Sequence, residues 1–290
     1  MAEARIGIIG GSGLYRMDGL KNVREEFIVT PFGDPSDVYI LGELEGEKVA
    51  FLPRHGKGHR HLPSELNFRA NIWGFKNLGV EWIIAVGAVG SLKEELKPLD
   101  IVLPDQFFDR TNQARKMTFF GDGIVAHVSF ADPTCSVLRE IIHQAALEMD
   151  AGVHRGGTYI NMEGPAFSTR AESRVYRQWG MDVIGMTNLA EAKLCREAEI
   201  CYQNIAMVTD YDVWRSGEGC EDVSIETVIE NLTRNAEMAR GIIRKTLPRI
   251  PAVRSCECAT ALENAIITSP DAIPPEKKQQ LELLIGKYIK

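Results

Sequence analysis

Residues 5–13 of this 290-residue chain have the sequence RIGIIGGSG, an apolar segment that ends in a cluster of glycines. The apolar part is typical of a buried β-strand, and the glycines are typical of a tight turn whose backbone N–H groups can approach an anion. Similar apolar segments recur, and we expect strands at 5–9, 48–52, 82–86, 100–103, 159–162, 182–186 and 202–209. These segments predict a sheet of buried strands.

Longer segments with helical periodicity lie between these strands. Helices are expected at 67–78, 136–149, 169–179, 190–198 and 224–245. The alternation predicts an α/β fold with helices on both faces of the sheet and a ligand site beyond the carboxyl ends of the strands. From residue 248 prolines interrupt the pattern, so we expect one domain over residues 1–249 and a C-terminal tail over 250–290, which ends in a helix at 276–290.

Charge and composition exclude several classes of protein. The chain has 33 Lys and Arg residues against 40 Asp and Glu residues, a formal charge of −7. This balance argues against general nucleic-acid binding, because phosphate contacts need a basic surface. The first residues lack the features of a secretory signal, and the longest mostly apolar stretch, 80–92, is too short to span a bilayer. We therefore expect a cytoplasmic protein with no nucleic-acid or membrane partner.

Two groups of residues could be considered as metal ligands. His59 and His61 lie in a segment rich in Gly and Pro, which opposes a helical metal pair, and we interpret them as ordinary loop histidines. Cys256 and Cys258 could bind a metal, form a disulfide or remain ordinary thiols. Zinc usually takes four ligands from two closely spaced pairs, and no second pair with such spacing is visible. We therefore predict no metal site.

Three loops at predicted strand ends indicate an anion-binding site. The first is the glycine turn that contains Ser12; it lacks the third glycine of a dinucleotide-binding fingerprint, since Arg16 stands there. The second contains Arg54, a bidentate donor for phosphate, and His55, which can add a further donor. The third, residues 87–91, consists of small residues with free backbone N–H groups. Together these loops predict a site for inorganic phosphate or a similar anion.

Other strand ends and loops contain residues suited to a purine nucleoside. Asp210 and Asp212 are two residues apart at the end of a predicted strand, so their side chains can point to one ligand. Phe167, in a loop before a helix, could stack on a planar base. Met186 and Thr187 combine an adaptable apolar side chain with a hydroxyl at another strand end.

These motifs, in this order, resemble those of the S-methyl-5'-thioadenosine phosphorylase branch of the purine nucleoside phosphorylase superfamily. The resemblance extends over about residues 6–249. It is carried by GGSGL at 10–14, RHG at 54–56, NIW at 71–73, DQF at 105–107, DRT at 109–111, EGP at 163–165, FSTRAES at 167–173 and AMVTDYD at 206–212. It implies a single phosphorylase/hydrolase-like domain, with a central mixed twisted β-sheet flanked by helices.

The resemblance also implies a reaction and a set of site residues. The reaction is phosphorolysis of S-methyl-5'-thioadenosine to adenine and 5-methylthioribose 1-phosphate, a pentosyl transfer in methionine and purine salvage. Inorganic phosphate is then a co-substrate, and no cofactor is expected. Phosphate would contact Ser12, Arg54, His55, Ala88 and Thr187, the ribose would contact Met186, and the purine would contact Phe167, Ser168, Asp210 and Asp212.

Further implications concern the assembly and the departures from the family pattern. The methylthio pocket would include Ile225, Val228 and Ile229, and His127 would come from a neighbouring subunit of a trimer or of a hexamer made of two trimers. Gly87 stands where many relatives have a Thr that contacts phosphate, so one donor is missing. Cys256 and Cys258 resemble a pair that forms a disulfide in some thermostable members.

The expected mechanism follows from the charge that develops as the glycosidic bond breaks. The sugar becomes cationic and the purine anionic, so the enzyme must hold an anion at the ribose and a proton at purine N7. Two close carboxylates cannot both ionise easily, and we expect Asp210 to be protonated beside Asp212 and to donate this proton. The alternatives are a phosphorylase for S-methyl-5'-thioinosine or for purine nucleosides in general and, more distantly, a non-catalytic nucleotide-binding protein.

Overall fold

The computed structural model describes residues 2–11, 19–112, 114–215 and 225–289, and for residues 225–228 it describes the backbone alone. The strands are β1 (Ile6–Gly10), β2 (Lys21–Glu26), β3 (Tyr39–Leu44), β4 (Glu47–Pro53), β5 (Trp82–Ser91), β6 (Ile101–Leu103), β7 (Gln106–Arg110), β8 (Val153–Arg155), β9 (Thr158–Met162), β10 (Val183–Gly185) and β11 (Cys201–Asp210). The α-helices are α1 (Phe68–Asn77), α2 (Ser136–Leu147), α3 (Arg170–Gln178), α4 (Asn188–Glu197), α5 (Ile225–Thr246) and α6 (Pro275–Ile285). The 3₁₀ helices are η1 (Leu247–Arg249), η2 (Glu257–Thr260) and η3 (Pro270–Ala272). None of the described helices is both long enough and apolar enough to cross a membrane.

The strands form one mixed sheet of 11 strands within the described part of the chain. At one side β2, β3 and β4 are antiparallel, whereas β4, β1 and β5 run parallel. The sheet branches at β5, which pairs in parallel with β11 and, at its end, antiparallel with β10. One branch continues through β9 to β7, and the other continues from β11 through β6 to β8. The expected α/β fold with a mixed sheet is confirmed.

The register of the central strands places their carboxyl ends at one edge. Ile9 of β1 lies opposite Leu52 of β4 and Ala85 of β5, and Asn204 of β11 lies opposite the same Ala85. Because these strands are parallel, the residues that follow each of them leave the sheet at the same edge. The loops after β1 and β4 that the sequence analysis selected are therefore neighbours in space. Residues 87–91, which were expected to form a loop, are instead the second half of β5, where Gly87, Ala88 and Val89 lie opposite residues of β11.

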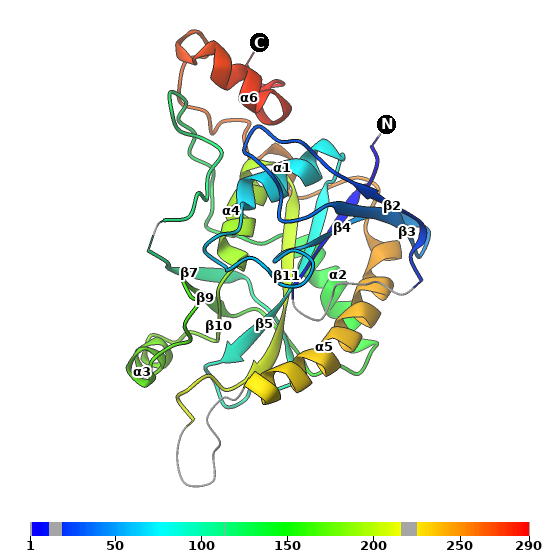
Figure 1. Cartoon of the computed structure of the whole chain (residues 1–290), viewed down its shortest axis with the longest axis vertical. Coiled ribbons are helices and arrows are strands. Elements are labelled where there is room, and N and C mark those ends of the chain that lie inside the picture. Colours follow the sequence, from blue (N-terminus) through cyan, green and yellow to red (C-terminus); the bar gives the residue numbers. More distant parts are fainter. Residues whose placement is uncertain (1, 12–18, 113, 216–224, 290) are drawn as a thin grey trace.

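Helices cover both faces of the sheet, as the apolar strands require. Ile8 and Ile84 pack in an apolar cluster with α2 and α5, whereas Ile9 and Ile83 pack in a second cluster with α1 and α4. Neighbouring strand residues point to opposite faces, so fully apolar strands supply both clusters. In Figure 1, α1 lies beside α4 and α2 lies beside α5, and these pairs are in contact.

Four strands differ from the expectation, because β2, β3, β7 and β8 were not predicted. In β2, whose sequence is KNVREE, only Glu26 is partly shielded from solvent, and most of β7 is exposed. Their sequences therefore lack the continuous apolar run that marks a buried strand. Pairing with a neighbouring strand, rather than burial of side chains, defines β2 and β7. In β3, by contrast, Tyr39, Leu41 and Leu44 are buried.

The last helix belongs to the main core. α6 contributes Leu281, Leu284 and Ile285 to the cluster that also contains Phe75 of α1 and Ile9 of β1. The C-terminal residues therefore help to bury one face of the sheet, and Figure 1 shows α6 beyond α1 near the N-terminal strands. The division of the chain at residue 249 stays a prediction.

We expect Leu284→Ala to lower the free energy of unfolding by about 2–5 kcal/mol, because Leu284 is 2% exposed and its truncation leaves a cavity. The matched control is Leu283→Ala, since Leu283 is 38% exposed and its truncation should change stability by about 0.5 kcal/mol or less. Urea unfolding measures both changes. Equal, small effects would mean that α6 is not part of the cooperative core.

Candidate active site

A cavity of about 340 Å³ opens at the carboxyl ends of β1, β4, β5, β10 and β11. This volume lies within the range of small-molecule sites. Among the predicted site residues, those that line the cavity are Arg54, His55, Ala88, Phe167, Met186, Thr187, Asp210 and Asp212. Residues from five strand ends that are distant in the sequence therefore share one concave site.

Arg54 is buried at the base of this cavity and is paired with Glu191 of α4. Its Nε donates to Glu191 Oε1 and its Nη2 donates to Glu191 Oε2 at 3.2 Å. Its Nη1 donates to the carbonyl oxygen of Val86 in β5 at 2.8 Å. Burial alone would lower the pKa of Arg54, but the Glu191 carboxylate outweighs burial and raises it. The guanidinium is therefore a fixed cation, but its bidentate fork holds Glu191 rather than remaining free for phosphate.

Glu191 is a functional residue that the sequence analysis missed. Its Oε2 also accepts hydrogen bonds from Tyr202 Oη at 2.7 Å and from Asn188 Nδ2 at 3.1 Å. A buried carboxylate with three partners is well satisfied, and it aligns Arg54 toward the cavity. A glutamate within a helix resembles an ordinary surface residue in the sequence, so nothing there indicated this pairing.

The cavity end near Arg54 is suited to an anion. Thr187, the N-cap of α4, lines this end, and its side chain makes no capping hydrogen bond, whereas the N–H of Leu189 at the same helix end donates to Asn161 Oδ1 at 3.1 Å. Gly11 and Gly87 also line this end, and a Cβ at Gly11 would lie 3.0 Å from Arg54 Nη1. Small residues therefore allow an anion to approach both the guanidinium and the backbone. A Cβ at Gly87 would meet Asn188 Oδ1 only at 3.4 Å, so a side chain could fit there.

His55 is neutral in the free protein. Burial, reinforced by the positive charge of Arg54, lowers its pKa to about 4. Its Nδ1 lies 2.9 Å from the carbonyl oxygen of His61, which can only accept, so Nδ1 carries the proton and Nε2 has a free lone pair. This corrects the expectation that His55 adds a second donor, because its remaining nitrogen accepts a hydrogen bond from a hydroxyl.

His59 also belongs to the site, which corrects its interpretation as an ordinary loop histidine. It lines the cavity, and its ring stacks on that of His55 with 4.3 Å between centroids and 24° between planes. Burial lowers its pKa. His61 does not line the cavity, but its carbonyl oxygen orients His55.

Asp210 and Asp212 meet at the other end of the cavity. Asp210 accepts hydrogen bonds from the backbone N–H of Asp212 and from Thr209 Oγ1, both at 2.7 Å. The first bond holds Asp212 in a left-handed conformation with φ of 50°. A Cβ at Gly90 would lie 3.1 Å from Asp210 Oδ1 and 3.3 Å from Asp212 Cβ, so glycine leaves room for the pair. The two carboxyl groups are thus positioned by strand ends rather than by a flexible loop.

The surroundings of the two carboxyl groups bear on which of them holds a proton. Burial raises the pKa of both groups, but its effect on Asp210 is opposed by the two hydrogen bonds that favour the ionised form. For Asp212, burial raises the pKa most, hydrogen bonds with Ser173, Val213 and Ser168 oppose it, and the charge of Asp210 adds to it, so that the pKa is about 6. Asp212 is therefore a candidate for the protonated group, beside Asp210, which the sequence analysis had selected.

The loop residues near the Asp pair are positioned by Arg115, which the sequence analysis did not select. Arg115 donates to the carbonyl oxygens of Met186 and Glu163 and pairs with the Glu163 carboxylate at 3.0 Å. Phe167 lines the cavity with 60% of its surface exposed, so its ring is available to a ligand. Ser168 is buried beside Met162 and does not line the cavity.

The remaining predicted residues lie elsewhere or outside the described residues. Ser12 is not described, and Ile225 and Val228 are described only as backbone at the start of α5. Ile229 is 56% exposed and does not line the cavity, where Leu232 of the same helix does. His127 lines a second cavity, also of about 340 Å³, with Arg196 and Glu257 among its other residues. A role for His127 in the site therefore requires another subunit.

Comparisons with known proteins agree with this geometry. Residues 5–248 match the phosphorylase superfamily. The chain is 58% identical to the S-methyl-5'-thioadenosine phosphorylase of Geobacter sulfurreducens, over 99% of this chain and 100% of that protein. The chain belongs to the S-methyl-5'-thioadenosine phosphorylase family. This finding confirms the resemblance drawn from the motifs.

Solved structures of the family superimpose on the chain along nearly its whole length. The crystal structure of a methylthioadenosine phosphorylase from an antarctic soil metagenomic library has a TM-score of 0.92 and 50% identity, and the match covers 98% of this chain and 99% of that one. Methylthioadenosine phosphorylase from Schistosoma mansoni in complex with adenine has a TM-score of 0.83 and 34% identity, with 98% of each chain covered. The C-terminal residues are thus included in the similarity.

The Arg54–Glu191 pair leads to a prediction about phosphate. We expect Glu191→Gln to lower the free energy of unfolding by about 3–5 kcal/mol, because it leaves a buried cation without its counter-charge. Inorganic phosphate should then raise the melting temperature of this variant more than that of the wild type. Glu197→Gln is the matched control, since Glu197 is buried in the same helix but bonds to Thr118 and Phe119. Equal phosphate effects in all three proteins would place phosphate away from Arg54.

Proposed function

We propose that the protein catalyses the phosphorolysis of S-methyl-5'-thioadenosine to adenine and 5-methylthioribose 1-phosphate. The observation that carries this proposal is a single cavity with Arg54 and the N-terminus of α4 at one end and the Asp210–Asp212 pair at the other. Phosphorolysis of a purine nucleoside needs an anion at the sugar and a proton at the base. The names of the relatives support the choice of the methylthio substrate.

The anion end holds the attacking phosphate near the sugar. Arg54 supplies the positive charge through Nη1, while the Thr187 hydroxyl and the backbone along residues 87–88 are proposed to supply hydrogen bonds. Neutral His55 accepts, at Nε2, a hydrogen bond from a protonated oxygen of phosphate or from a ribose hydroxyl. A phosphate anion held there stabilises the cationic sugar as the glycosidic bond lengthens. Ser12 is proposed as a further phosphate ligand from the family resemblance.

The acid end supplies the proton to the departing purine. Asp212, whose pKa is raised to about 6, is proposed to carry this proton in the free enzyme and to donate it to N7. Asp210 accepts two hydrogen bonds that favour its ionised form against burial, and it is proposed to accept a further one from the exocyclic amine of a 6-aminopurine. Phe167 lies open to the cavity and is proposed to pack on the base, with Ser168 behind it.

Apolar residues between the two ends suit the methylthioribose. Met186 lines the cavity at the expected ribose position, and Leu62, Pro63 and Leu232 provide further apolar lining. Ile225, Val228 and Ile229 are proposed to extend this lining from α5. A pocket of this kind excludes a hydroxyl analogue only by about a hundredfold, so adenosine is expected as a side substrate.

The family resemblance also supports a proposal about the working state of the enzyme. We propose a homotrimer, or a dimer of trimers, in which His127 of each subunit completes the site of a neighbour. Inorganic phosphate is the proposed co-substrate, with no cofactor, and the proposed location is the cytoplasm. Phosphorolysis of S-methyl-5'-thioinosine or of other purine nucleosides is a second candidate. The residue at position 210 argues against it, because Asp suits a 6-aminopurine, whereas Asn is expected for a 6-oxopurine.

Product analysis after incubation with S-methyl-5'-thioadenosine tests the reaction. We expect adenine and 5-methylthioribose 1-phosphate in equal amounts, and only when inorganic phosphate is present. Full-rate release of adenine without phosphate would identify a hydrolase, and binding without turnover would identify a non-catalytic protein. Parallel incubation with S-methyl-5'-thioinosine should release hypoxanthine more slowly than adenine is released; the reverse order would favour the second candidate.

The acid assignment predicts the pH profile of kcat/KM, which reports groups in the free enzyme. Because Asp212 must be protonated and its pKa is about 6, kcat/KM should decline as the pH rises above about 6, approaching a tenfold loss for each unit. Asp212→Asn should remove this decline and reduce kcat/KM by about 10²–10⁴-fold, the usual contribution of general acid catalysis.

Asp210→Asn is the matched comparison for this prediction. The titrating group remains, so the decline should persist, but at lower pH because the charge that raises the pKa of Asp212 is lost. The preference for 6-aminopurines over 6-oxopurines should also fall. A flat wild-type profile between about pH 5 and 8, or an unchanged profile in Asp212→Asn, would contradict the assignment.

A further inference from the structure

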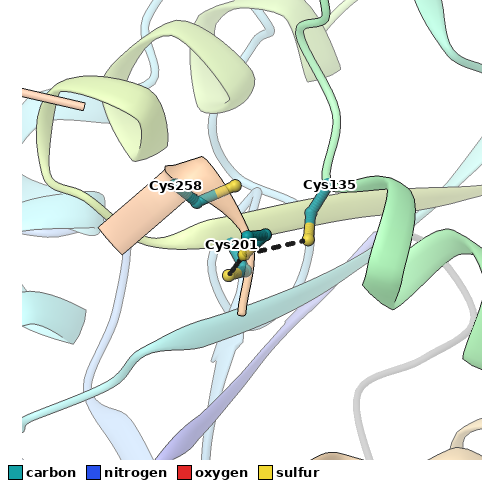
Figure 2. Close-up of side chains that lie close together, drawn as sticks. Cys135, Cys201 and Cys258 are labelled. Atoms are coloured by element: carbon teal, nitrogen blue, oxygen red, sulfur yellow. Dashed lines mark hydrogen bonds between the residues drawn. The ribbon is translucent and has the colours of Figure 1, made fainter. Parts of the chain in front are cut away.

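Four cysteines from three distant segments meet at the end of the sheet away from the cavity. Cys135 is the N-cap of α2, Cys201 is the first residue of β11, and Cys256 and Cys258 lie at the start of η2. Their Sγ atoms all lie within 4.8 Å of one another. Figure 2 shows the labelled side chains of Cys135, Cys201 and Cys258 converging from their separate elements.

The distances within this thiol cluster are close to those between the sulfur ligands of a tetrahedral zinc ion. The Sγ of Cys256 lies 3.3 Å from that of Cys201 and 3.7 Å from that of Cys135. A tetrahedral zinc ion with Zn–S bonds of about 2.3 Å places its sulfur ligands about 3.8 Å apart. We propose that Cys135, Cys201, Cys256 and Cys258 bind one zinc ion as a closed, four-thiolate structural site.

A metal accounts for this arrangement better than disulfides do. A disulfide brings two sulfur atoms to about 2.05 Å and makes no demand on a second pair. Here Cys256 is near two other sulfurs at once, and every sulfur is near every other. All four residues are free thiols in the structure, and the Cys256–Cys258 disulfide implied by the family resemblance stays a prediction that competes with the metal site.

The surroundings suit a structural site. Cys135, Cys201 and Cys258 are buried, and Cys256 is partly buried, which leaves little room for a substrate at the metal. Zinc binding would release four protons from the four thiols and leave a bound group with two negative charges. The N-terminal end of α2, at which Cys135 stands, favours such a charge.

The proposed ion would fasten the C-terminal segment to the sheet. Cys256 and Cys258 belong to that segment, and they pack in the same apolar cluster as Cys135 and Cys201. Hydrogen bonds from Arg5 to the carbonyl of Pro251 and from Arg254 to that of Glu199 already hold the same segment. Cys201 begins β11 and Asp210 ends it, so about 30 Å of strand separates the thiol cluster from the carboxyl pair.

Metal analysis tests the proposal on the full chain, purified with reductant, loaded with zinc and then freed of excess zinc by gel filtration. We expect about one zinc ion per chain in the wild type and at least a tenfold lower content in the double variant Cys256→Ser/Cys258→Ser. Cys195→Ser is the matched control, because Cys195 is a buried free thiol of α4 outside the cluster, and it should retain the metal. Cobalt(II) in place of zinc should give the intense visible bands of a tetrahedral thiolate complex in the wild type and in Cys195→Ser. The double variant should lack these bands.

A second measurement, on the wild type alone, avoids reliance on the folding of a variant. A strong chelator should remove the zinc and lower the melting temperature, and zinc alone should restore it. If no zinc is bound and the four thiols of the cluster are alkylated before any reduction, the proposal would be overturned in favour of free thiols. Thiols that react only after reduction would overturn it in favour of disulfides, and equal zinc in the double variant would show adventitious binding.

Discussion

Strand β5 is the constraint on which the site depends. It is hydrogen-bonded in parallel with β1 on one side and with β11 on the other, and its end turns to pair with β10. Parallel pairing brings the carboxyl ends of these strands to one edge, where Gly11, Arg54 and Asp210 follow or end their strands. Arg54 also donates to Val86 of β5, so the same strand that aligns the loops holds the cation of the site. Without this alignment the two ends of the cavity would have no fixed separation.

The two ends of the cavity solve opposite electrostatic problems. At one end Glu191 keeps the buried Arg54 charged, because a buried cation without a counter-charge would be strongly destabilising. At the other end burial and the charge of Asp210 favour the neutral form of Asp212. One end can therefore hold an anion and the other a proton at the same pH. The low pKa of His55 adds a neutral acceptor between charged groups.

The C-terminal residues are integral to the structure at two places. α6 covers one face of the sheet through Leu281, Leu284 and Ile285, and the segment before it brings Cys256 and Cys258 to the start of β11. Strand β11 thus connects the thiol cluster at its first residue with the carboxyl pair at its end. The contact of Cys256 and Cys258 with the first residue of this strand supports the sheet at the end opposite the cavity.

The sequence by itself determined the α/β fold, the main strands and several residues of the cavity, because apolar runs and glycine or charged residues at strand ends are local signals. It could not show β2 or β7, whose residues are mostly exposed and whose pairing depends on a neighbour. Only the tertiary structure decided that Glu191 holds Arg54, that His59 stacks on His55, and that burial raises the pKa of Asp212 to about 6. Likewise, the sequence showed one cysteine pair, while Cys135 and Cys201 joined it only through folding. The physical reason is the same in each case: burial, charge pairing and ligand geometry depend on residues that are far apart in the chain and meet only when the sheet has formed.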